Sequence, residues 1–176
     1  MQVGGVMELN NWAVTILFVG LVTAVISDFS SSRVPNKLTF SMVLVATVLH
    51  AWFGQWEGLM FASTGLVAGL LCFLPFHLFG AMGAGDVKLL AAVGTVVGPG
   101  TVVIAALMTI LAGGVIALVY ITVRGGLPAM LRRYSSMFVL LTAKQPQYIP
   151  PAPGEAAGLR FPYALAIACG TALAII

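Results

Sequence analysis

The amino-acid sequence predicts an all-α, polytopic integral membrane protein with six transmembrane helices. Apolar residues make up 60% of the 176 residues and charged residues only 7%, whereas a soluble domain typically carries about 25% charged residues. The apolar residues gather in runs that short polar or Gly-Pro segments separate. High hydrophobicity excludes a disordered chain, and two cysteines exclude a disulfide scaffold.

Six apolar segments are expected to cross the membrane, since roughly 20 residues span its hydrocarbon core. The fourth is short and stops at Gly98-Pro99-Gly100, which does not continue a regular helix. No basic residue precedes Arg33, so the first segment is expected to be a permanent helix rather than a cleaved signal peptide. The six segments are residues 12–27, 38–52, 59–79, 87–97, 101–123 and 161–176.

Residues 124–160 are expected to form a cytoplasmic loop of a single membrane-embedded domain, which comprises residues 1–176. In the first part of this loop, apolar residues recur beside Arg132 and Arg133, a pattern typical of an amphipathic helix at the membrane surface. The second part, residues 145–158, contains four prolines and is expected to be irregular.

The distribution of basic residues predicts the orientation in the inner membrane. Six spans place residues 28–37, 80–88 and 124–160 on one side, and these loops contain all eight lysines and arginines. The positive-inside rule makes this side cytoplasmic and places both termini on the outer side. The net charge of +3 is therefore attributed to membrane orientation and not to nucleic-acid binding.

Two of the five acidic residues, Asp28 and Asp86, lie at the cytoplasmic ends of apolar segments, whereas Glu8, Glu57 and Glu155 lie in exposed segments. Acidic groups at membrane depth are costly and usually functional. Both aspartates lie at the same end of their spans, so we expect them to meet. Two close carboxyl groups in a low-dielectric site share a proton. One then acts as a base toward water and the other as an acid toward a carbonyl.

Four residues near the aspartates are candidates for substrate binding. Gly83 and Gly85 remove side-chain bulk before Asp86, which lets an extended substrate approach the backbone. The alternative is a flexible loop in which Asp86 caps the next helix. Asn36 is expected to cap the second span, with orientation of a catalytic group as the alternative. Lys88 is expected to reach the lipid headgroups, with an effect on Asp86 or a substrate contact as the alternative.

Together, two segments resemble the motifs of the type IV prepilin peptidases, a family of integral-membrane aspartic proteases that belongs with the Gly-x-Gly-Asp intramembrane proteases. Asp28-Phe29-Ser30-Ser31-Ser32-Arg33-Val34-Pro35-Asn36 resembles the motif of the first aspartate. Gly83-Ala84-Gly85-Asp86-Val87-Lys88-Leu89-Leu90-Ala91-Ala92 resembles that of the second. Phe161-Pro162-Tyr163-Ala164-Leu165-Ala166 is more weakly similar to the proline-containing last helix.

The resemblance implies that Asp28 and Asp86 are the catalytic pair of an endopeptidase that removes the basic leader from type IV prepilins at the cytoplasmic face. Larger members also carry paired Cys-x-x-Cys motifs and methylate the new N-terminus. Here Cys72 and Cys169 lie in separate spans, so a tetrathiolate zinc site is excluded and methyltransferase activity is not expected.

The chain therefore looks like the minimal form that serves Flp-type (tight-adherence) pili, with an archaeal prepilin or preflagellin peptidase as the neighbouring alternative. The expected partners are a prepilin and membrane lipid, with no cofactor, metal or nucleic acid, and the oligomeric state stays open. Two other function classes are a proton-coupled transporter with Asp28 and Asp86 as a relay, and a non-catalytic assembly subunit. The position of both aspartates at one end of their spans favours the peptidase.

Overall fold

The computed structural model describes residues 11–31, 33–80, 82–123, 125–143 and 163–176. These residues form five α-helices, and among them there is no strand. The chain divides into two compact units, one with residues 1–113 and 162–176 and the other with residues 114–161. The helices are α1 (Asn11–Ser31), α2 (Asn36–Leu78), α3 (Ala84–Val123), α4 (Leu127–Thr142) and α5 (Tyr163–Ile175).

The predicted all-α class is confirmed, but the predicted count of six helices is wrong. The expected second and third spans lie in one helix, α2, and the expected fourth and fifth spans lie in α3. A straight helix of the 43 residues of α2 would be about 65 Å long, roughly twice the thickness of the hydrocarbon core. The backbone inside α2 and α3 therefore has to change direction.

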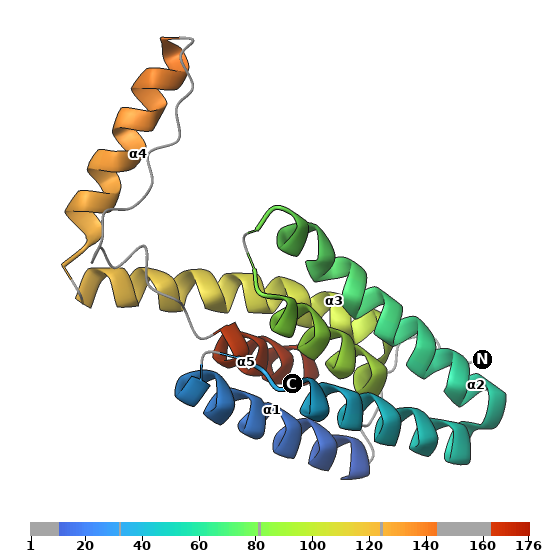
Figure 1. Ribbon diagram of the computed structural model, residues 1–176. Coiled ribbons are helices and arrows are strands. Elements are labelled where there is room, and N and C mark those ends of the chain that lie inside the picture. The colour runs from blue at the N-terminus through green and yellow to red at the C-terminus, as the bar shows by residue number, and fades with distance from the viewer. Residues whose placement is uncertain (1–10, 32, 81, 124, 144–162) are drawn as a thin grey trace. The chain divides into compact units, whose positions relative to one another are not determined.

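The reversal in α2 lies at Gln55, whose backbone is non-helical (φ 49°, ψ −128°). Beyond it, Gly58 packs directly against the carbonyl oxygen of His50. In a straight helix, positions eight residues apart lie about 12 Å apart along the axis. The contact therefore shows that α2 turns back on itself, as Figure 1 shows. The break expected between the second and third spans is real, but it is too short to end the helix.

The reversal in α3 lies at Gly98, with φ 83° and ψ 174°. Glycine adopts this positive φ without the strain of other residues, and Pro99 has no N–H to continue the hydrogen-bond ladder. The ring of Phe61 lies directly against Gly98. Across the bend, a methyl group on Gly94 would lie 3.2 Å from the side chain of Val102, which follows the bend. The predicted Gly-Pro-Gly break is thus a sharp bend.

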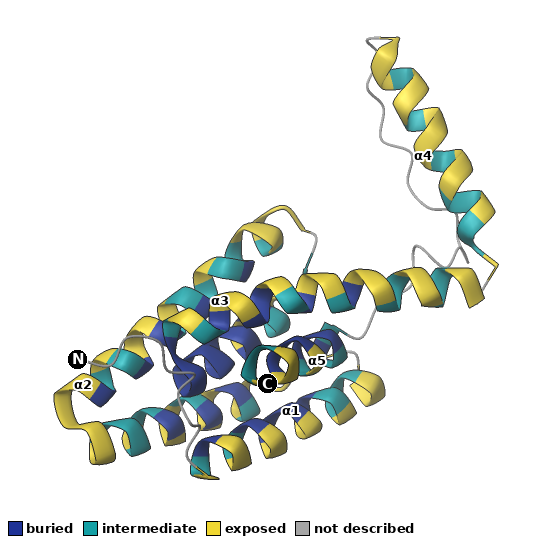
Figure 2. Cartoon of the chain, turned by 180° about the vertical axis from the view of Figure 1, so that it is seen from behind, coloured by how far each residue is buried: buried dark blue, intermediate teal, exposed yellow. Residues whose placement is uncertain are grey.

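Three helices of the described chain, α1, α2 and α3, are long and apolar enough to cross a membrane, and α5 is a shorter apolar helix. Their outward faces carry many exposed large apolar side chains, including Phe18, Leu44 and Leu107. Figure 2 shows these exposed residues around a buried interior. An apolar exterior of this extent indicates a protein that lies in a bilayer.

The first half of α3 forms the centre of the first unit. Leu89, Leu90, Val93 and Val96 are fully buried there. Helix α1 contacts both α2 and α5, and its buried residues lie on one face, as the helical period requires. Asp86, in the first turn of α3, is therefore attached to the most rigidly packed segment of the unit.

Glycines allow the second half of α2 to approach α3 closely. Gly65 and Gly94 face each other, so that a methyl group on either would overlap the backbone of the other. One turn further on, a methyl group on Gly69 would lie 2.6 Å from the carbonyl oxygen of Leu90. The Gly65-x-x-x-Gly69 pair therefore packs within the bundle, as small residues do between membrane helices.

Several expectations fall outside the described residues or stay predictions. Residues 1–10, 124 and 144–162 lie outside the described part of the chain, and so do Glu8, Glu155 and Phe161-Pro162. The segment expected as a loop contains α4, none of whose residues is buried. The single membrane-embedded domain of residues 1–176 and the cytoplasmic side of its loop stay predictions.

Candidate active site

Asp28 lies near the C-terminal end of α1 and is half-buried. Its carboxylate oxygen Oδ2 accepts a hydrogen bond of 3.2 Å from the backbone N–H of Ala164. Ala164 is the second residue of α5, where backbone N–H groups have no partner within the helix. This hydrogen bond from the start of α5 holds the carboxyl group in place.

Asp86 is the third residue of α3 and is also half-buried. Its backbone N–H donates to the carbonyl oxygen of Gly83 at 3.2 Å, and its carboxyl group hydrogen-bonds with the backbone of Gly83. A side chain three positions into a helix that bonds back to the residue before the helix is the arrangement of a capping box. A methyl group on Gly83 would lie 3.0 Å from Asp86 Oδ2, so glycine leaves this carboxyl group accessible.

The fold brings the two carboxyl groups together from different helices. Asp28 and Asp86 lie close enough for their negative charges to interact, although 57 residues separate them in the sequence. Two carboxyl groups at this range do not both ionise readily. The structure thus places the two aspartates that the sequence singled out on neighbouring helix ends.

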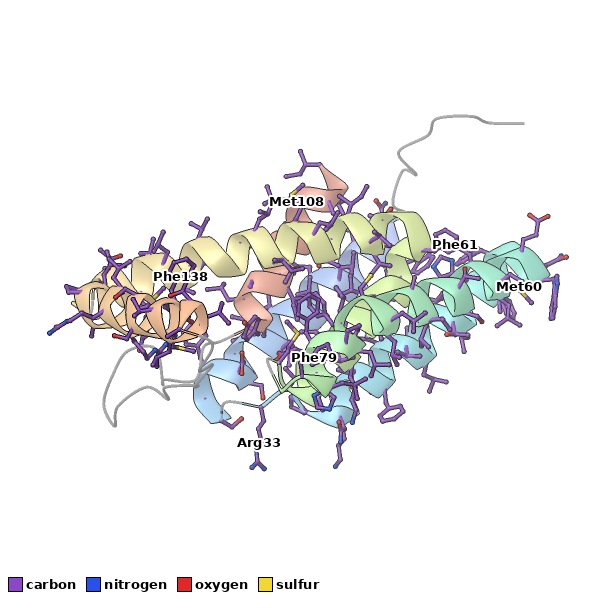
Figure 3. All side chains as sticks on the ribbon, turned by 90° about the horizontal axis from the view of Figure 1, so that it is seen from above. Arg33, Met60, Phe61, Phe79, Met108 and Phe138 are labelled. Atoms are coloured by element: carbon purple, nitrogen blue, oxygen red, sulfur yellow. The ribbon has the colours of Figure 1, made fainter. Side chains whose placement is uncertain are left out.

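The segments that carry the aspartates also contact each other through Val34 and Gly85. Val34 is buried between α1 and α2, and a methyl group on Gly85 would lie 3.3 Å from its Cβ and 3.5 Å from its nitrogen. The hydroxyl of Ser27 donates to the carbonyl oxygen of Arg33 at 3.0 Å and closes the turn after α1. In Figure 3 the side chain of Arg33 itself extends away from the helices.

A second contact joins Lys88 and Asn36. The ammonium group of Lys88 donates a hydrogen bond of 3.0 Å to Asn36 Oδ1. The expectation that Asn36 caps the second span is wrong, because Pro35 is the N-cap of α2 and no side chain caps it. The carbonyl oxygen of Pro35 instead accepts from Leu38 and Thr39. Asn36 is thus free to link the first turn of α2 to α3.

Sequence reasoning missed two partners of the site. The N–H of Ala164 belongs to the backbone, and the only sequence signal was Pro162, since proline is common at a helix start. His77 Nδ1 lies 3.0 Å from the carbonyl oxygen of Met82 and so holds the backbone that leads into Gly83. Nothing in the sequence marked His77 except that it lies nine residues before Asp86.

The sequence can be compared with those of known families. A model of the type IV leader peptidase family matches residues 15–118, more than half of the chain. The chain belongs to this family. The family membership supports a leader peptidase function, and with the apolar helices it indicates an integral protein of the inner membrane. No curated protein and no solved structure matches the chain.

The matched range contains Asp28, Asn36, Gly83, Gly85, Asp86 and Lys88 and ends before α4 and α5. Ala164, the partner of Asp28, therefore lies outside it. Cys72 and Cys169 are free cysteines. Among the described residues, no group of three or more His, Cys, Asp or Glu side chains is arranged to hold a metal ion.

Proposed function

We propose that this leader peptidase is an aspartic endopeptidase whose catalytic residues are Asp28 and Asp86. One observation carries the proposal: α1 and α3 bring the two carboxyl groups within interacting range, and a separate backbone group bonds each of them. Family membership supplies the reaction class.

The proposed mechanism needs one ionised and one protonated aspartate. The ionised carboxylate takes a proton from a water molecule as its oxygen adds to the carbonyl carbon of the scissile bond. The protonated carboxyl group gives its proton to the carbonyl oxygen, which forms a tetrahedral intermediate. When the C–N bond breaks, the nitrogen takes the proton that the first aspartate accepted from water, and the second aspartate takes a proton back from a hydroxyl group of the intermediate. A carboxylic acid and an amine are released, and both aspartates return to their starting states.

The four residues around the pair have different proposed roles. Gly83 is exposed beside Asp86, so the main chain of an extended substrate can approach there. Gly85 packs on Val34, and Lys88 hydrogen-bonds with Asn36. These contacts join the two segments that carry the aspartates and so position the proposed substrate-binding site.

The proposed substrate is a prepilin of the Flp type, cut at the cytoplasmic face without methylation of the new N-terminus. The orientation is supported by the basic residues of the expected cytoplasmic loops: Arg33 and Lys37 follow Asp28 in the sequence, and Lys88 follows Asp86. The absence of any Cys-x-x-Cys motif in the sequence supports an activity limited to proteolysis. For the described residues, the proton-coupled transporter gains no support, because both aspartates lie at helix ends.

Leader removal in cells tests the proposal. A Flp-type prepilin is co-expressed with the wild-type protein, Asp28→Asn or Asp86→Asn, and cleavage is read as a mobility shift of the pilin. Glu57→Gln is the matched control, since Glu57 is exposed at the reversal of α2. We expect cleavage with the wild type and the control alone, at equal amounts of membrane-inserted protein. Cleavage by either aspartate variant at the wild-type level would contradict the catalytic assignment.

A further inference from the structure

Helix α4 has a continuous apolar face. Its large apolar side chains recur every three or four residues, the spacing that places them on one side of a helix. The opposite side carries Arg132, Arg133, Ser135 and Ser136, with Val139 and Leu140 among them. The apolar face consists of Met130, Leu131, Tyr134, Met137, Phe138 and Leu141.

Within their own unit, the described residues 114–123 and 125–143 do not bury this face. No residue of α4 is buried, and Leu131, Phe138 and Leu141 are each about 60% exposed. Figure 2 shows the contrast with α1, where buried residues line one side, and Figure 3 marks Phe138 on α4. An exposed apolar stripe of this length requires an apolar surface to cover it.

The turn between α3 and α4 starts α4 at the end of a membrane-spanning helix. Gly125 has φ 66°, its N–H bonds the carbonyl oxygen of Thr122, and the N–H of Gly126 bonds that of Ile121. This pair of bonds is a Schellman motif, which ends a helix sharply. α4 begins at once at Leu127 and leaves α3 at a sharp corner (Figure 1). The length and apolar composition of α3 suffice to cross a bilayer, and a span that ends at Val123 would start α4 at the bilayer surface.

The charge of α4 identifies the kind of surface. Arg132 is exposed, and the guanidinium carbon of Arg133 lies 5.2 Å from the ring centre of Tyr134, beside the apolar face. The described residues of this unit, 114–123 and 125–143, include no aspartate or glutamate. A helix with an apolar face and only positive charge lies in the interface of an anionic membrane.

We propose that α4 is an in-plane membrane-surface helix, which inserts its apolar face between lipids and binds anionic headgroups through Arg132. This inference does not depend on the catalytic pair. It gives α4 a lipid ligand that is separate from the peptide substrate.

Site-directed spin labelling of the full-length protein tests the inference. Cys72 and Cys169 are replaced by serine, and single cysteines are placed in turn from position 129 to position 141. The labelled protein is reconstituted in vesicles of phosphatidylcholine alone or with 30% phosphatidylglycerol, the latter fraction being about that of an anionic membrane. Oxygen, which concentrates in the bilayer, and a water-soluble nickel complex then report the surroundings of each label.

In the anionic vesicles we expect oxygen accessibility to peak at positions 130, 134, 138 and 141 and nickel accessibility to peak at positions 132 and 136. Arg132→Gln should weaken this pattern, since one arginine near an anionic surface favours the docked state by about fivefold. Lys37→Gln removes the same charge from another exposed segment and should leave the pattern unchanged.

Three results would overturn the inference. Accessibility of every labelled position to the nickel complex would show that water surrounds α4. Exclusion of both reagents from the apolar face would show that protein covers it. An oxygen pattern that is the same in both vesicle types and in the arginine variant would refute the binding of anionic headgroups.

Discussion

The ammonium group of Lys88 donates a 3.0 Å hydrogen bond to Asn36 Oδ1, and this bond ties the start of α2 to the first turns of α3. Lys88 is two residues after Asp86, and Asn36 ends the segment that begins at Asp28. The bond therefore spans the two halves of the candidate site. Since neither side chain bonds an aspartate in the described structure, we interpret both as positioning residues.

Lys88→Met should slow leader cleavage by about fivefold, the value of one hydrogen bond of about 1 kcal/mol. Asn36→Ala should have a similar effect, and the double variant should be no slower than either single variant, because the two changes remove the same interaction. Cleavage rates of the purified, reconstituted protein measure this coupling. Lys37→Met is the control, because Lys37 is an equally exposed lysine one residue after Asn36. Independent, multiplicative effects would contradict the positioning role.

Gly85→Ala should lower the cleavage rate on the order of tenfold while the protein stays folded. The added methyl group would lie 3.3 Å from Val34 Cβ, so the two segments must move apart, and small misplacements of catalytic groups are costly. Val34→Gly in the same chain removes that Cβ and should restore part of the rate. Gly100→Ala adds the same methyl group where nothing lies within 4 Å and should have no effect. A normal rate for Gly85→Ala would show that this contact does not position the aspartates.

Gly65→Ala should destabilise the bundle by about 1–3 kcal/mol, the usual cost of overpacking. Its methyl group would overlap the backbone of Gly94, and the backbone cannot move aside as a flexible side chain can. Thermal unfolding in detergent measures the effect. Gly114→Ala, in a helical position with nothing within 4 Å, should keep or raise the melting temperature because alanine favours helix. Equal melting temperatures for the two variants would mean that α2 and α3 pack differently.

The sequence predicted the positions of the apolar segments and of the breaks between them better than it predicted the number of helices. The breaks near Gln55 and Gly98 were both expected, but each reversal takes only one non-helical residue. A Gly-Pro-Gly run is typical both of a loop and of a sharp bend, so composition does not distinguish them. The burial of the first half of α3 followed no periodic pattern, because neighbours surround this segment on all sides.

For the candidate site, the sequence identified the aspartates but not their surroundings. Asp28 and Asp86 were recognisable because charge is rare in apolar segments. The bond from Ala164 to Asp28 joins residues 136 positions apart, and its donor is a backbone group that every residue carries. Asn36 was misassigned as a cap because asparagine favours that position, whereas tertiary structure gave it Lys88 as a partner.

The rate of cleavage should fall on both sides of an optimum pH. At low pH the aspartate that acts as the base becomes protonated, and at high pH the aspartate that acts as the acid loses its proton, so both limbs belong to the pair. The profile is measured with the purified protein in vesicles that have the same pH on both sides. A rate that keeps rising with pH, with no falling limb, would rule out a protonated aspartate in the mechanism.

The central claim is that Asp28 and Asp86 act as one unit, and single-turnover cleavage of a purified prepilin tests it most directly. The rates of Asp28→Asn, Asp86→Asn and the double variant are compared with the wild type at equal amounts of folded protein. The account predicts losses of about a thousandfold or more for each single variant and no further loss for the double, as for catalytic residues that work together. Either single variant at more than a tenth of the wild-type rate would contradict it.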